Sequence, residues 1–141
     1  MAKSSKRISQ FAHTFIIAAE RCSLPRKLPD GQIEMPLIPG LICRAFSIEL
    51  NFKAIITQEN HTERGHELSD LFDKINESTR TEIINKSGYS KSIFYKNLKE
   101  ASDTFIKWRY MYEQGSIHCD LGFLKVLSDV AQDISRKVCQ E

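Results

Sequence analysis

The sequence lacks the features that mark several large classes of protein. No apolar run approaches the ~18–20 residues that a membrane-spanning helix needs, and the stretch FIIAA at 15–19 is too short for a secretory signal. The four cysteines (Cys22, Cys43, Cys119 and Cys139) form no CxxC pair and have no zinc-site spacing. We therefore expect a cytoplasmic protein with no membrane contact and no structural zinc.

The short signatures of metal, phosphate and nucleophile sites are also missing. The chain has no HExxH, no GxSxG and no P-loop. Its formal net charge of +2 is too small to indicate nucleic-acid binding by composition alone, although it leaves room for a local basic groove. We expect neither a metal ion nor a cofactor.

The residues that are present describe an ordinary globular chain. It has 141 residues, 41% hydrophobic and 27% charged, which predicts one domain spanning 1–141. Apolar residues recur at three- and four-residue spacings almost throughout, and this period indicates helices. The expected helices are Ser5–Cys22, Pro36–Gln58, a short helix at Leu68–Ile75, Glu77–Lys86, Ser92–Glu113 and a last helix capped by Asp120. Three prolines and a glycine in SLPRKLPDGQIEMP predict a loop at 23–35.

These helices predict an all-α fold. Because short connections favour antiparallel neighbours, we expect an antiparallel up-and-down four-helix bundle with short additional helices. In the first helix, Phe11 and Ala12 share the apolar face. The second helix is apolar over most of its circumference, including Ile38, with a narrow polar sector around Ser47 and Asn51. Such a helix is expected at the centre of the fold.

Two of the long helices carry charged residues within their apolar faces. Glu49 lies inside the stripe of 36–58, with Lys53 one turn later at its edge. Arg109 lies inside the stripe of 92–113, with Glu113 one turn later. Breaking a buried ion pair typically costs ~3–5 kcal/mol, so opposite charges that face inward are expected to meet.

We therefore predict a polar cluster formed by these four residues and flanked by Tyr112. Arginine suits such a place because its planar guanidinium binds a carboxylate bidentately and stacks on aromatic rings such as Trp108. Two interpretations remain open: the cluster fixes the register of the helices, or it forms a functional site between them. His66, which precedes a helix in RGHELSDLF, either joins such a site or lies on the surface.

Three stretches taken in order resemble one family. RAFSIELNFKAII carries an ExxxK helix, RGHELSDLF fits GHxLxxLF, and WRYMYE fits WRYxYE. Together they resemble a branch of the HEPN superfamily over about residues 40–135. The resemblance implies an all-α up-and-down bundle that commonly dimerises. Many relatives are metal-independent ribonucleases in toxin–antitoxin and phage-defence systems, and others are RNA-binding or interaction modules.

From this resemblance we expect a metal-independent ribonuclease or toxin-type effector that acts as a homodimer, with an antitoxin or another protein as partner. Its catalytic residues would be Arg109, His66 and Glu49. RNA or a nucleotide would be bound by Lys53, Tyr112 and Glu113. The alternative is a non-catalytic HEPN module that binds RNA, a nucleotide or a protein partner.

The chain departs from the usual HEPN pattern in one respect. Active members carry an arginine followed after four to six residues by a histidine, whereas eight residues, including Gly115, separate Arg109 from His118. A substitute dyad of Arg109 and His66, from different helices, is one solution. The other is a catalytically inactive dimer in which the charged cluster only holds the bundle together.

Overall fold

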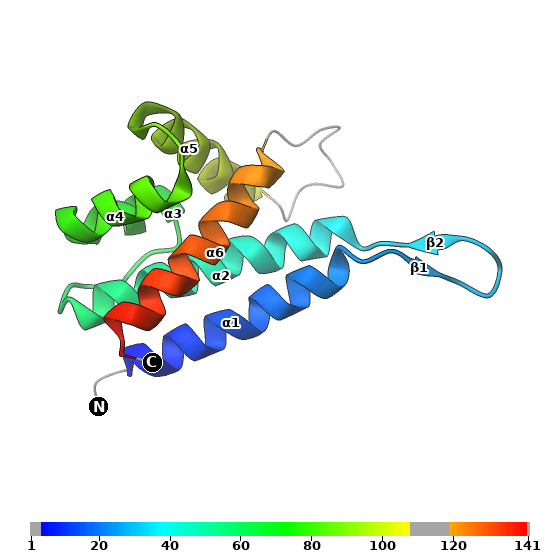
Figure 1. Ribbon diagram of the computed structural model, residues 1–141, viewed down its shortest axis with the longest axis horizontal. Coiled ribbons are helices and arrows are strands. Elements are labelled where there is room, and N and C mark those ends of the chain that lie inside the picture. The colour runs from blue at the N-terminus through cyan, green and yellow to red at the C-terminus, as the bar shows by residue number, and fades with distance from the viewer. Residues whose placement is uncertain (1–3, 108–118, 141) are drawn as a thin grey trace.

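The structure, a computed structural model, describes residues 4–107 and 119–140. Within these ranges the chain forms six helices and one small hairpin (Figure 1). The elements are α1 (Ser5–Cys22), β1 (Arg26–Lys27), β2 (Ile33–Glu34), α2 (Leu37–Gln58), α3 (Leu68–Lys74), α4 (Glu77–Ser87), α5 (Lys91–Lys107) and α6 (Leu121–Val138). The predicted all-α character is confirmed, and none of the helices in the described part is long and apolar enough to cross a membrane.

The helix ends follow local signals in the sequence. Helix α1 has the bounds predicted from the sequence. At its start, the hydroxyl of Ser4 accepts a hydrogen bond from the backbone N–H of Arg7. The predicted cap of α6 is confirmed, because Asp120 Oδ1 accepts from the N–H of Phe123 at 3.0 Å. At the end of α4, Gly88 adopts a left-handed φ of 79°, which glycine tolerates without steric cost.

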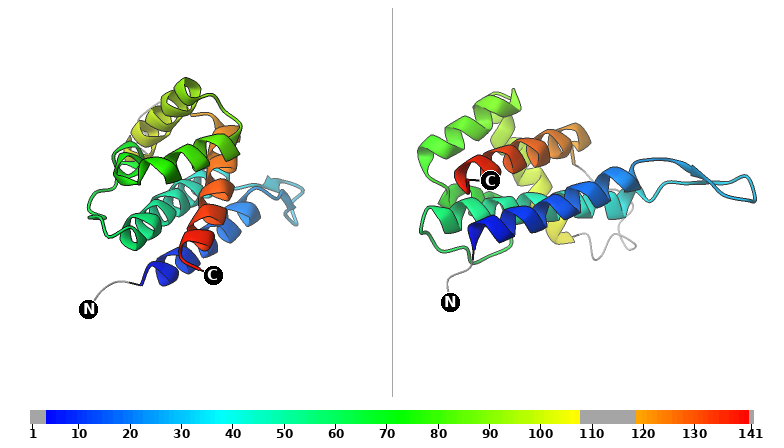
Figure 2. Two further views of the ribbon diagram at one scale, coloured as in Figure 1. Left: turned by 60° about the vertical axis from the view of Figure 1, so that its left-hand side comes forward. Right: turned by 60° about the horizontal axis from the view of Figure 1, so that its bottom comes forward.

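Helix α2 lies at the centre of the fold, as its wide apolar surface predicts. It packs against α1, α3, α5 and α6 (Figures 1 and 2). Four fully buried rings link these layers: Phe52 of α2 contacts Phe72 of α3, Phe72 contacts Phe94 of α5, and Phe94 contacts Phe123 of α6. Burial of such side chains contributes roughly 1.5–3 kcal/mol each, so this row of rings is a main part of the core.

The narrow polar sector of α2 around Ser47 and Asn51 lies inside the protein. Both side chains are fully buried, because α6 covers this sector. Asn51 donates to Gln132 Oε1 at 3.1 Å and accepts from the Ser135 hydroxyl at 2.7 Å. Ser135 also contacts the hydroxyl of Ser9 on α1 at 2.8 Å. Polar groups therefore join α1, α2 and α6 inside the protein, where each finds a partner.

Two expectations about buried faces need correction. Phe11 was expected on the inner face of α1 but is 55% exposed, and its ring packs edge-on against Phe15. The face of α1 that is buried carries Ser9, Ala12, Ile16 and Ala19. Ile38 is 44% exposed because the first turn of α2 extends beyond the part that other helices cover.

The segment predicted as a loop at 23–35 contains the β1–β2 hairpin. Arg26 pairs with Glu34 and Lys27 with Ile33 in antiparallel register. The turn is held by Asp30, whose Oδ1 accepts from the Gln32 N–H at 2.9 Å. The hairpin extends away from the helices, between two long helices, α1 and α2, that run antiparallel beside each other (Figure 1).

Candidate functional site

The candidate site starts from an ion pair on the central helix. Glu49 and Lys53 lie one turn apart on α2, and Lys53 Nζ is 3.1 Å from Glu49 Oε2. The Glu49 side chain is only 5% exposed and that of Lys53 18%. The prediction that Glu49 faces inward is confirmed, and its charge is balanced by a neighbour that its own helix supplies.

His66 reaches the same carboxylate from the loop at 59–67. Its Nδ1 lies 3.3 Å from Glu49 Oε2, while the His66 side chain is 81% exposed. The loop turns back along α2, and it is tied there a second time where Thr57 Oγ1 donates to Glu63 Oε2 at 2.5 Å. Gly65 has a φ of 108°, a conformation that other residues rarely adopt, and it lets the chain turn just before His66.

This geometry determines which nitrogen of His66 is available for chemistry. An ionised carboxylate only accepts hydrogen bonds, so Nδ1 must carry the proton that it donates to Glu49. In the neutral ring Nε2 is then unprotonated, and it belongs to a side chain that is mostly in solvent. A histidine held in this way is suited to take up and release a proton at Nε2.

The other predicted site residues lie outside the described residues. Arg109, Tyr112 and Glu113 fall in 108–118, so the expected pairing of Arg109 with Glu49 stays a prediction. The structure brings together three of the six candidates, Glu49, Lys53 and His66, which we call the Glu49 cluster. No group of three or more His, Cys, Asp or Glu side chains that could hold a metal ion occurs in the ranges that the structure describes.

An open pocket lies beside the loop that carries His66. It has a volume of about 470 Å³ and is lined by Thr57, His61, Thr62, Glu63 and Arg64. His61 Nε2 lies 2.8 Å from Asn76 Oδ1, which ties the loop to the start of α4. Arg64 adds a positive charge two residues from His66. Sequence reasoning did not identify this pocket, because a loop has no period from which its folded path follows.

A buried arginine on α2 was also missed. Arg44 is 8% exposed, and its Nη1 donates to Ser128 Oγ on α6 at 2.9 Å and lies 4.0 Å from Asp129 Oδ1. The available signal was its position in a helix that is apolar on nearly every side. Because its partners are on α6 and not at the Glu49 cluster, we assign it a structural role.

The fold and the site define a mostly helical protein that holds an exposed histidine on a buried carboxylate of its central helix. Comparisons with protein-family models, with curated proteins and with solved structures gave no match for the chain. The Glu49 cluster and the motifs of the sequence are therefore the features that bear on its function.

Proposed function

We propose that the chain is a HEPN-like domain, built as an antiparallel up-and-down bundle, that cleaves RNA without a metal ion and acts as a homodimer. The observation that carries the proposal is the 3.3 Å contact between Nδ1 of the exposed His66 and the buried carboxylate of Glu49. The order of the ExxxK, GHxLxxLF and WRYxYE motifs supports it. The position of the first two motifs supports it further, because ExxxK supplies Glu49 and Lys53, and GHxLxxLF supplies His66.

In the proposed reaction, Nε2 of His66 accepts the proton of a ribose 2′-hydroxyl. The 2′-oxygen attacks the adjacent phosphorus, the bond to the 5′-oxygen breaks, and a 2′,3′-cyclic phosphate forms. Glu49 orients the imidazole and stabilises its protonated form. Arg109 would stabilise the negative charge that develops on the phosphorane, with Lys53 adding positive potential from its partly buried position.

The leaving 5′-oxygen needs a proton, and a homodimer provides a source for it. In the HEPN pattern, two motifs meet around the RNA, so the His66 of a second copy would act as the acid. Tyr112 and Glu113 are proposed to contact the RNA near the cleaved bond. An antitoxin or other protein partner would then act by covering this surface.

The test is degradation of a single-stranded RNA by the purified protein in the presence of EDTA. We expect His66→Ala to lower the rate by about 10²-fold or more, since a positioned acid–base group contributes roughly 10²–10⁴-fold. Glu49→Gln and Arg109→Ala are expected to lower it as well. His61→Ala is the matched control, because His61 lies on the same loop but contacts Asn76. Equal rates for wild type, His66→Ala and Arg109→Ala would remove these residues from the mechanism.

The second candidate is a non-catalytic HEPN module that binds RNA, a nucleotide or a protein partner. It is favoured by the eight-residue separation of Arg109 from His118 and by the fact that the Glu49 cluster also ties the 59–67 loop to α2. In this case RNA binds without being cleaved, and the affinity falls as salt rises. Failure of RNA and nucleotides to bind at low salt would leave protein interaction as the remaining role.

A further inference from the structure

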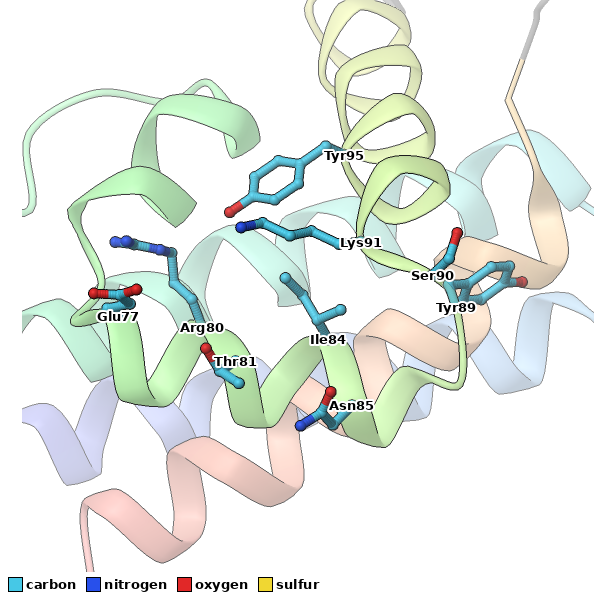
Figure 3. Close-up of a pocket in the computed structure, with 9 residues that line it drawn as sticks. All are labelled: Glu77, Arg80, Thr81, Ile84, Asn85, Tyr89, Ser90, Lys91 and Tyr95. Carbon is cyan, nitrogen blue, oxygen red and sulfur yellow. The ribbon is translucent and has the colours of Figure 1, made fainter.

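A second pocket lies between α4 and α5, on residues that the Glu49 cluster does not use. Its volume is about 280 Å³ (Figure 3). Arg80, Thr81 and Ile84 line it from α4, and Lys91 and Tyr95 line it from α5. Figure 3 shows that the amine of Lys91 and the hydroxyl of Tyr95 point to the same side, toward Arg80, with Ile84 below them. The lining therefore contains three hydrogen-bond donors, those of Arg80, Lys91 and Tyr95, and the apolar side chain of Ile84.

The guanidinium of Arg80 is held in place without being neutralised. Its Nη1 donates to the backbone carbonyl of Asp73 at 3.0 Å and to that of Ile75. These carbonyls belong to the end of α3 and the residue after it, and they carry no net charge. Arg80 is half-buried, so its side chain is positioned by the protein. Its positive charge remains available to a ligand.

The pocket as a whole carries excess positive charge. Lys91 and Arg80 are the cations and Glu77 is the only carboxylate among the lining residues. In the described part of the chain, neither Lys91 nor Arg80 forms an ion pair. Two cations from different helices that line one pocket repel each other, and a bound anion would offset this repulsion.

The donors favour a phosphate monoester as that anion. Arginine and lysine are the side chains that bind phosphate best, and the Tyr95 hydroxyl adds a neutral donor. The pocket volume corresponds to about nine waters at about 30 Å³ each, which is more than a bare phosphate ion fills. The Ile84 side chain, the Thr81 hydroxyl and the Glu77 carboxylate suit a sugar that carries apolar C–H groups and hydroxyl donors.

We propose that the α4–α5 pocket binds a small sugar phosphate or nucleoside monophosphate through its phosphate monoester. Arg80 and Lys91 pair with the phosphate, and Tyr95 donates a hydrogen bond to it. The proposal goes beyond the proposed ribonuclease function, because it rests on other residues. Binding is measured without RNA, so its failure would leave the ribonuclease proposal unaffected.

The experiment is isothermal titration of the full chain with ribose 5-phosphate, adenosine 5′-monophosphate, inorganic phosphate and ribose, each at millimolar concentration. We expect at least one of the two monoesters to bind, ribose to show no binding, and inorganic phosphate to bind more weakly than the monoester. Absence of binding by both monoesters overturns the proposal. Inorganic phosphate that binds as tightly as the better monoester also overturns it, since the sugar would then contribute nothing.

Variants of exposed or partly exposed residues locate the site without unfolding the protein. Lys91→Ala is expected to weaken monoester binding by about tenfold or more, the effect of losing a charged hydrogen bond. Tyr95→Phe removes the hydroxyl but keeps the ring that packs against Phe72 and Phe94, and it is expected to weaken binding several-fold. The matched control is Lys96→Ala, an exposed lysine of α5 outside the pocket. Equal effects of Lys91→Ala and Lys96→Ala would show non-specific attraction and refute the assignment.

Discussion

A double-mutant cycle on Glu49 and Lys53 tests how strongly burial couples the two charges of the Glu49 cluster. Glu49→Gln keeps the shape of the side chain and removes its charge, and Lys53→Met keeps most of the aliphatic length. Each single variant leaves one charge without its partner in a place that is 5% or 18% exposed. The double variant removes both charges, so no buried charge is left without a counter-charge.

The expected magnitude follows from the distance and the burial. At 3.1 Å and an effective dielectric constant of about 20, the attraction is about 5 kcal/mol, which desolvation of both groups partly offsets. Since Lys53 retains some contact with water, we expect each single variant to lose about 2 kcal/mol and the double variant about 1 kcal/mol. The coupling free energy is then about 3 kcal/mol, whereas exposed pairs typically give ~0.2–1 kcal/mol.

The assay is urea denaturation of the four proteins at neutral pH, followed by far-UV circular dichroism. His66→Ala serves as a fifth protein, and we expect it to change the free energy of unfolding by less than about 0.5 kcal/mol because the side chain is 81% exposed. A coupling free energy below about 0.5 kcal/mol would show that the pair behaves as a solvated surface pair. Glu49 would then not act as a buried carboxylate on which the site is built.

Three other expectations can be checked on single residues. Asn51→Leu should cost about 2–4 kcal/mol in urea denaturation, because it removes two buried hydrogen bonds, including the one that Asn51 donates to Gln132 Oε1, and an unchanged midpoint would contradict this. The hydrogen bond from Lys137 lowers the pKa of the Glu82 carboxyl in the folded protein. The interaction therefore stabilises the folded state above the ordinary carboxylate pKa, and this stabilisation is lost as the pH falls through the lowered pKa of Glu82. Melting curves of Glu82→Gln should therefore show a loss of at most about 1 kcal/mol at neutral pH and none in strong acid, and a loss that persists in acid would argue against the ion pair. Burial raises the pKa of Cys119 to about 11. Alkylation of this thiol by iodoacetamide, followed by mass spectrometry, should therefore be slow near neutral pH and faster as the pH approaches the raised pKa. Rapid alkylation near neutral pH would be inconsistent with the burial of the thiol.

Part of the candidate site was readable from the spacing of residues within one helix. Glu49 and Lys53 are four residues apart, so they share a face of α2 whatever the rest of the chain does. The apolar residues around Glu49 placed that face inward, and the structure agrees. From the sequence, His66 could either join the site or lie on the surface. Its contact with Glu49 depends on the path of the 59–67 loop, and a loop has no residue period from which its path can be predicted.

Caps, breakers and a 3.6-residue period act over a few neighbouring residues, so the approximate bounds of α1 to α4, the cap of α6 and the inward position of Glu49 follow from the sequence alone. The predicted helix end at Glu113 lies outside the described residues. No local signal shows that α6 covers Ser47 and Asn51, that Arg44 donates to Ser128, or that two cations line the α4–α5 pocket, because these features depend on how the helices pack. A helix specifies its own faces, but the element that covers each face is chosen by the packing of the whole chain. Polar residues that pair across helices are therefore indistinguishable, in one sequence, from polar residues that face water.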